Sequence, residues 1–325
     1  MRVQLIGLGS IGKSLLQLIM KKERYIKEMI GEGINVVSVS DSTGTIVSEG
    51  MPLDHIIHAK EKGGLGTLDS FEKMGALKAI ADVDSDLVVE VTQSTDDGRP
   101  GVDHVLAAFN HGKDVVTANK GVLISDTDII RKAIESGRII RYEATVCGGV
   151  PVFNLMDYSI KTAKIKSIEG VFNATSSFVL SQMEQGRSKT VAISEAIKVG
   201  LAEHDPSDDL TGIDSARKGL ILHRRLFGSR LTLKDASIAV SEEIMKPSMR
   251  QVTNVEKDGV SVTLKMKDEK RYLSLIEGPS MIIRFNTDTF DNLTLFTEHD
   301  GPLESSSAVL NDIVLAAMSR KIRKA

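Results

Sequence analysis

The chain has no tryptophan, a single cysteine and only 4% aromatic residues among its 325 positions. So few aromatic rings argue against the stacking surfaces that bind carbohydrates or single-stranded nucleic acids. One cysteine cannot form an internal disulfide framework, which favours a cytoplasmic protein. No apolar run is long enough to span a bilayer, and the chain starts directly in a strand pattern without a signal peptide. We therefore expect no membrane partner.

Charge of either sign is also not in excess, because 41 basic residues face 44 acidic ones and the net charge is −3. No global basic field therefore attracts nucleic acid or an anionic membrane surface. Hydrophobic content of 41% and charged content of 26% are ordinary for a globular protein, and the length favours two domains. We expect a small-molecule substrate and no nucleic-acid partner.

The first residues carry the clearest motif. A predicted strand over Arg2–Ile6 runs into Gly7-Leu8-Gly9-Ser10-Ile11-Gly12, and an apolar helical pattern follows from Lys13 to about Met20. Its first glycine permits a tight turn, the second lets the backbone approach a pyrophosphate, and the third allows close helix–strand packing. This context favours a Rossmann-type site for NAD(P) over a glycine turn that binds nothing. The predicted cofactor contacts in the motif are Gly7, Gly9, Ser10, Ile11 and Gly12.

The next strand, predicted over 35–40, ends at Asp41, which can accept hydrogen bonds from an adenosine ribose. That favours NAD, but Ser40, Ser42, Thr43 and Lys60 could instead hold the 2′-phosphate of NADP, so the cofactor preference stays open. A second helix, predicted over 25–32, accounts for the long distance between Gly12 and Asp41.

Strands and helices continue to alternate up to residue 142, which predicts a parallel sheet with right-handed crossovers. The further predicted strands are 86–91, 114–117 and 138–142, and the further predicted helices are 53–62, 70–74, 102–110 and 127–136. Thr92, Ser94 and Lys120 follow strands directly, on the edge where open parallel sheets bind ligands. A functional role for Lys120 is favoured over that of an ordinary surface lysine. We place the first domain at 1–145.

The regular alternation of strands and helices stops after a glycine turn near residue 148. A strand over 164–172 and helices over 175–185 and 191–199 precede an acidic stretch, and short strand-like runs follow at 260–266, 272–275, 281–285 and 292–297. This pattern predicts a second, α+β domain at 146–305 with a mostly antiparallel sheet. A closing helix over 306–320 is expected to pack back on the first domain.

The acidic stretch from Glu203 to Lys218 holds five carboxylates. We expect a loop up to Gly212, a capping box between Thr211 and Asp214, and a helix ending near Gly228. Asp214 and Lys218 are four residues apart and so share a helix face. An ordinary surface ion pair would explain this spacing, but the cofactor motif favours a pocket wall that binds a substrate ammonium and exchanges a proton.

Several blocks together are similar to homoserine dehydrogenase in its short form, without a fused aspartate kinase or a regulatory domain. They are Gly7–Gly12, Thr117-Ala118-Asn119-Lys120-Gly121, Glu143–Val146, the stretch from Ala202 through Asp205-Pro206-Ser207-Asp208-Asp209 to Asp214, and Ser307-Ala308-Val309. The resemblance implies reversible reduction of L-aspartate 4-semialdehyde to L-homoserine with NADH or NADPH. It also implies a homodimer formed through the second domain's sheet.

The resemblance also implies roles for individual residues. Substrate binding falls to Glu203, Asp209, Asp214, Thr175 and Lys120. Lys218 and Lys120 are the candidates for proton transfer, with Asp214 orienting Lys218, and the two lysines are expected to converge on one cleft. Thr92 and Gly301 match cofactor contacts. Glu143 and the carbonyls of Val146, Gly148 and Val150 match a monovalent cation site, usually sodium.

The chain departs from the family pattern at Ala174, Cys147, Leu201 and His204, where Gly, Gly, Tyr and Pro are usual. Two alternative functions rest on other features. A phosphate-dependent aspartate semialdehyde dehydrogenase would use Cys147 as its nucleophile, although no histidine is near it in sequence and an inert turn residue is the favoured interpretation. A non-catalytic dinucleotide sensor would keep the glycine motif but would not need the acidic cluster.

Overall fold

The computed structural model describes residues 1–47 and 49–324. Two compact units are formed, one by Met1–Thr145 with Ser305–Ala325 and the other by Val146–Glu304. The last helix, α12 (Pro302–Lys324), begins in the second unit and continues through the first. Among these described residues, no helix combines the length and apolar character needed to cross a membrane. Each unit is described below by itself.

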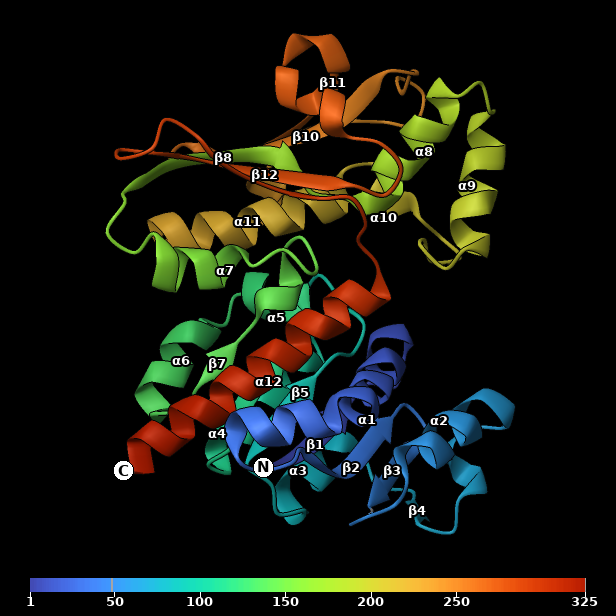
Figure 1. The fold of residues 1–325 in the computed structure, drawn as a ribbon, viewed down its shortest axis with the longest axis vertical. Coiled ribbons are helices and arrows are strands. Elements are labelled where there is room, and N and C mark those ends of the chain that lie inside the picture. The colour runs from blue at the N-terminus through green and yellow to red at the C-terminus, as the bar shows by residue number, and fades with distance from the viewer. Residues whose placement is uncertain (48, 325) are drawn as a thin grey trace. The chain divides into compact units, whose positions relative to one another are not determined.

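The first unit contains a seven-stranded sheet in the order β4-β3-β2-β1-β5-β6-β7 (Figure 1). Its strands are β1 (Arg2–Ile6), β2 (Asn35–Asp41), β3 (Gly44–Val47), β4 (Phe71–Glu72), β5 (Leu87–Glu90), β6 (Asp114–Thr117) and β7 (Ile140–Arg141). The five strands from β2 to β7 in this order are parallel, as predicted. β3 and β4 form an antiparallel edge that the sequence analysis did not predict. The chain reverses because Asp41 accepts a hydrogen bond from the Thr43 backbone and Gly44 adopts φ 156°.

Helices cover both faces of this sheet. On one face α1 (Ser10–Ile30), α2 (Leu53–Lys62) and α12 contribute to a core that includes Leu16, Ile56 and Ile313. On the other face α3 (Ala76–Asp82), α4 (Gly101–Asn110) and α6 (Ile129–Ser136) form a second core with Val88 and Val115. Two short segments, α5 (Lys120–Ile124) and the 3-10 turn η1 (Leu65–Thr67), complete the unit with η2 (Glu143–Thr145).

Two helix predictions in this unit are wrong. The separate helices expected over 13–20 and 25–32 are one helix, because Ile19, Ile26 and Ile30 continue a single buried stripe. Gly31, in the left-handed conformation, ends it. The segment predicted as a helix over 70–74 instead contains the edge strand β4. The longer α1 accounts for the distance between the glycine motif and Asp41.

The second unit holds a six-stranded sheet in the order β13-β12-β8-β10-β11-β9. Its strands are β8 (Ile165–Val171), β9 (Ser237–Ala239), β10 (Met249–Glu256), β11 (Gly259–Met266), β12 (Met281–Thr287) and β13 (Leu293–Thr297). Pairing is antiparallel except between β11 and β9, which agrees with the α+β prediction. The strand expected over 272–275 is wrong: η6 (Arg271–Leu275) is a 3-10 helix that buries Tyr272 and Leu273 against Val171 and Ile282.

The helices of this unit are α7 (Val152–Asn154), α8 (Ala174–Glu184), α9 (Lys189–Lys198), α10 (Ser207–Leu210) and α11 (Ile213–Phe227), with short turns η3 (Leu155–Ser159), η4 (Leu233–Asp235) and η5 (Lys267–Glu269). Helix α11 packs closely on β10 and β11 through Gly219, where an added Cβ would lie 2.6 Å from the Val260 side chain. It ends at Gly228 as predicted. The predicted capping box is wrong, because Gly212 is the N-cap and the Thr211 hydroxyl donates to the Ser207 carbonyl of α10.

Candidate active site

The glycine turn between β1 and α1 has the geometry that a pyrophosphate site requires. Gly7 has φ +105°, and an added Cβ there would lie 2.6 Å from the Val91 carbonyl oxygen. An added Cβ on Gly12 would lie 2.2 Å from the Gly7 carbonyl oxygen. At Gly9, by contrast, an added Cβ would meet nothing within 4 Å. Open space therefore lies beside Gly9 at the N-terminus of a 21-residue helix, whose N–H groups favour an anion. These residues fit the phosphates of a dinucleotide.

The first turn of α1 is also tied to α12. The Ser306 hydroxyl donates a hydrogen bond of 3.0 Å to the carbonyl of Ile11, inside the glycine motif. Gly301, the predicted cofactor contact near this helix, directly precedes α12 and belongs to the second unit. Its role stays a prediction.

At the end of β2, Asp41 is held by two neighbours. Lys60 of α2 lies 2.5 Å from one carboxylate oxygen, and the Thr43 backbone and hydroxyl donate to the other at 2.8 and 2.6 Å. Burial acts to raise the pKa of Asp41, but these hydrogen bonds outweigh it and hold that pKa below its usual value. The carboxylate suited to a ribose and the ammonium suited to a 2′-phosphate thus occupy the same corner, which keeps both cofactors compatible with the site.

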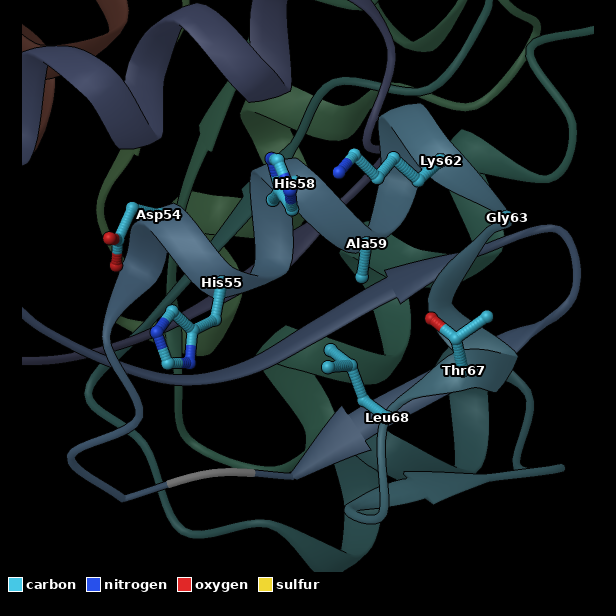
Figure 2. A pocket seen from close by; sticks show the side chains of 8 residues that line it. All are labelled: Asp54, His55, His58, Ala59, Lys62, Gly63, Thr67 and Leu68. Atoms are coloured by element: carbon cyan, nitrogen blue, oxygen red, sulfur yellow. The ribbon is translucent and has the colours of Figure 1, made fainter.

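Helix α2 also borders an open hollow of about 550 Å³ (Figure 2). Side chains that line it include His55, His58 and Lys62 of α2 and Thr67 and Leu68 of the following segment. None of the predicted site residues lines this hollow.

The ends of β5 and β6 bring three predicted residues into one corner of the first unit. The Thr92 backbone donates to the carboxylate of Glu90 at 3.1 Å, and the Ser94 hydroxyl donates to the Asn119 side-chain oxygen at 2.9 Å. Lys120 is the first residue of α5, for which Asn119 is the N-cap. Thr92, Ser94 and Lys120 therefore share the sheet edge predicted for the cofactor.

The sequence analysis did not predict the buried polar cluster of Glu90, His104 and Asn119 at the ends of β5 and β6. Glu90 is fully buried, and His104 and Asn119 are its hydrogen-bond partners, at 2.7 and 3.2 Å. An acidic residue at the end of an otherwise apolar strand was the one available signal for Glu90. His104 carried none, since a histidine within a helix is usually an ordinary structural residue.

The second unit contains a compact charged cluster around Asn173, the N-cap of α8. The Asn173 side-chain nitrogen donates to Asp209 at 2.6 Å and to Asp214 at 2.9 Å. Lys218 lies 2.8 Å from the same Asp214 oxygen and donates to the Phe172 carbonyl at 2.6 Å. The side chains of Lys218 and Asp214 are only 12% and 11% exposed, so their ion pair is largely desolvated.

The charges in this cluster perturb one another. Burial and the nearby Asp214 charge raise the pKa of Asp209 to about 6, against hydrogen bonds from Asn173 and Thr175. Burial acts to lower the pKa of Lys218, but the charge and hydrogen bond of Asp214, with Cys147 and Asp300, together outweigh it and raise that pKa above its usual value. A carboxyl and an ammonium whose pKa values are both displaced within one buried cluster are typical of functional sites.

The remaining predicted substrate residues are placed differently. Thr175 is buried at the start of α8, and its hydroxyl donates to the Leu201 carbonyl at 3.3 Å. Glu203 is exposed, and within residues 1–47 and 49–324 no hydrogen bond joins it to Asn173, Asp209 or Lys218. Asn173 itself was not predicted. An asparagine between a strand and a helix pattern is a common cap, and that was its only signal.

The predicted cation residues fall in two places. Glu143 is buried in the first unit, where its backbone N–H donates to Asp312 at 2.8 Å. In the second unit, Cys147 and Gly148 have φ 56° and 49°, and the Val150 N–H donates to the Cys147 carbonyl at 2.9 Å, which closes a tight turn. Across the described residues there is no group of three or more His, Cys, Asp or Glu side chains that could hold a metal. The sodium site, built mainly on carbonyls, stays a prediction.

Comparison with known proteins identifies the family. The family model described as homoserine dehydrogenase, NAD binding domain, matches residues 7–143, and the homoserine dehydrogenase model matches 151–314. A homoserine dehydrogenase of Methanocaldococcus jannaschii is 32% identical over 97% of this chain and 98% of its own length.

Solved structures agree with this assignment. The crystal structure of homoserine dehydrogenase from Thermoplasma acidophilum superposes with a TM-score of 0.85 at 33% identity, over 98% of this chain and 99% of that one. A hyperthermophilic archaeal homoserine dehydrogenase in complex with NADPH gives a TM-score of 0.85 at 27% identity, over 98% of both chains. Neither the thiol-dependent semialdehyde dehydrogenase nor the non-catalytic sensor is supported by these matches. The chain belongs to the homoserine dehydrogenase family and is an NAD(P)-dependent oxidoreductase.

Proposed function

We propose that this chain interconverts L-aspartate 4-semialdehyde and L-homoserine with Lys218 as the proton-transfer group. The observation that carries the proposal is the ion pair between Lys218 and Asp214, which sits in a cluster with Asp209 and Asn173. A buried ammonium beside several carboxylates suits a substrate that has both an ammonium group and a reacting oxygen.

The cofactor is assigned to the first unit. Gly7, Gly9, Ser10, Ile11 and Gly12 would hold its pyrophosphate, Asp41 and Lys60 its adenosine end, and Thr92, Ser94 and Lys120 its nicotinamide end. When bound, NAD(P) supplies or accepts the hydride. The open space beside Gly9 and the paired charges of Asp41 and Lys60 support this assignment.

Lys218 stabilises the substrate oxygen and exchanges its proton. An ammonium has three N–H donors, and two of those of Lys218 are used by Asp214 and Phe172. We assign the third to the substrate oxygen. Because the Asp214 charge raises the pKa of Lys218, the side chain is a cation while the aldehyde is reduced, as charge stabilisation at oxygen requires. Lys120 is the second candidate for proton transfer and for substrate binding.

The carboxylates hold the other end of the amino acid. We assign the substrate ammonium to Asp209 and Glu203, and the orientation of Lys218 to Asp214. Thr175 follows Asn173, the N-cap of α8 that donates to Asp209, and we assign it to substrate binding as well. A carboxylate that is desolvated and crowded by a second negative charge gains most when a cation binds next to it.

Three further features belong to the proposal. Glu143 and the carbonyls of Val146, Gly148 and Val150 are assigned to a monovalent cation. A homodimer formed through the second unit's sheet follows from the resemblance to the family, and a cytoplasmic location follows from the single cysteine. Light scattering after size-exclusion chromatography measures the oligomer.

The test is an NAD(P)-coupled assay with L-homoserine, run with each cofactor, with sodium or potassium, and with or without phosphate. We expect reduction of the cofactor that depends on homoserine and does not require phosphate. No turnover of homoserine with either cofactor, by a folded protein that binds NADPH, would contradict the proposal.

A further inference from the structure

A carboxylate with no exposed surface lies beneath the predicted nicotinamide corner of the first unit. Glu90, the last residue of β5, accepts hydrogen bonds from the Thr92 backbone at 3.1 Å, from the Thr92 hydroxyl, and from Asn119 at 3.2 Å. A buried charge of this kind is tolerated only when donors surround it. Glu90 is therefore an organising centre for the residues that follow β5.

The third residue that contacts the Glu90 carboxylate comes from a helix. His104 of α4 is only 6% exposed, and its Nδ1 lies 2.7 Å from the second carboxylate oxygen of Glu90. When Glu90 is ionised its carboxylate only accepts hydrogen bonds, and His104 then donates to it through an Nδ1–H. His104 thus fixes the orientation of the carboxylate from below, while Thr92 and Asn119 bind its other oxygen.

Asn119 extends this arrangement to the end of β6. Its side-chain nitrogen lies 3.2 Å from the Thr92 hydroxyl as well as 3.2 Å from Glu90, and its side-chain oxygen accepts from Ser94. Lys120 is the next residue and begins α5. The Glu90 carboxylate therefore joins two loops, one with Thr92 and Ser94 and the other with Asn119 and Lys120.

We propose that Glu90 and His104 are positioning residues for the cofactor, and that together they hold Thr92 and Asn119 in the arrangement that binds the nicotinamide half of NAD(P). The inference rests on the proposed function for the site at the ends of β5 and β6. Neither residue touches the reacting atoms. They act by fixing neighbours before the cofactor binds, and a displacement of about 1 Å in such neighbours lowers activity on the order of 100-fold.

Substitutions at His104 separate positioning from simple packing. His104→Phe fills the space but removes the hydrogen-bond donor, and it is expected to raise the KM for NAD(P)H and lower kcat by about 10- to 100-fold in total. His104→Gln retains an N–H donor and should restore most of that loss. Glu90→Gln keeps the shape but loses the charge, and it should resemble His104→Phe.

A matched control lies in the same sheet, at the N-terminal end of β6 and not at the C-terminal ends of the strands. Lys113, just before β6, is also buried, and its ammonium donates to Gln4, Ile80 and Val83 at 2.9, 2.5 and 2.6 Å. Lys113→Met should lower the melting temperature but leave the KM for the cofactor unchanged. Melting temperatures measured beside the kinetics show whether each variant is folded.

The outcomes are distinct. A His104→Phe protein that melts lower, as Lys113→Met does, but keeps normal cofactor KM and kcat would overturn the proposal. If His104→Phe does not fold, Glu90→Gln decides in the same way, and His104→Gln remains the variant expected to keep near-normal kinetics. NADPH affinity measured by fluorescence reports on positioning even if the wild-type enzyme does not oxidise homoserine, so failure of this inference is distinguishable from failure of the proposed function.

Discussion

Asp209 and Asp214 share one hydrogen-bond donor, the side-chain nitrogen of Asn173, at 2.6 and 2.9 Å. Lys218 pairs with Asp214, whereas burial and the charge of Asp214 raise the pKa of the Asp209 carboxyl to about 6. This arrangement is suited to a cationic ligand, and it leads to predictions for pH dependence and for stability.

The pKa of Asp209 predicts a pH dependence of substrate binding. Asp209 must be ionised to bind an ammonium, and its pKa is raised to about 6 by burial and by Asp214. The KM for L-homoserine is therefore expected to be constant above pH 7 and to increase as the pH falls through 6. Initial rates at saturating cofactor between pH 5 and 8 measure it. The same profile in Asp209→Asn would assign the effect to another group.

The raised pKa of Asp209 also predicts that Asp209→Asn makes the folded protein more stable while it weakens substrate binding. A carboxyl whose folded-state pKa is raised favours folding below its unfolded pKa, and this contribution is lost as pH rises through the folded value near 6. At pH 8 the ionised Asp209 thus destabilises the fold by on the order of 1–3 kcal/mol. Denaturant unfolding at pH 8 should show the variant to be more stable, with the difference vanishing near pH 4.

Lys60 should discriminate between the two cofactors. Its ammonium pairs with Asp41 at the end of β2, and the sequence analysis named it among the residues that could hold a 2′-phosphate. Lys60→Ala is expected to raise the KM for NADPH about tenfold or more, because one charge-assisted contact is lost, and to change the KM for NADH much less. Equal effects on both cofactors would show that Lys60 acts only through Asp41.

Two glycines offer a matched test of cofactor binding against packing. A Cβ on Gly9 meets nothing within 4 Å, whereas a Cβ on Gly219 lies 2.6 Å from Val260. Gly9→Ala should therefore keep its melting temperature and lose cofactor affinity, because the methyl group occupies the space of the pyrophosphate. Gly219→Ala should lose about 1–3 kcal/mol of stability through overpacking and keep its cofactor KM. Thermal unfolding and cofactor titration measure both.

The parts predicted from sequence were those encoded locally. The glycine turn follows its strand directly, and Asp214 and Lys218 are one helical turn apart, so spacing alone predicted both. Asn173, in contrast, lies 36 and 41 residues from the carboxylates it joins. No periodicity relates residues at such separations, and they meet only because α8 and α11 pack on one sheet.

The incorrect predictions have similar causes. Strand β3, next to the edge strand, is four residues long and follows a turn whose Asp41 also suited a cofactor role, so no separate strand pattern was recognised there. The segment around Tyr272 has strand-like composition, but it buries its side chains as a 3-10 helix against the core. In both cases tertiary packing, and not local propensity, decides the conformation.

Turnover by Lys218→Met, compared with the wild type at saturating cofactor and L-homoserine, tests the central claim most directly. We predict that kcat falls by about 10²- to 10⁴-fold, the usual contribution of a proton-transfer group, while NADPH binds with unchanged affinity and the protein stays folded. Near-normal kcat in this variant would contradict the account, and a comparable loss in Lys120→Met alone would transfer the proton-transfer role to Lys120.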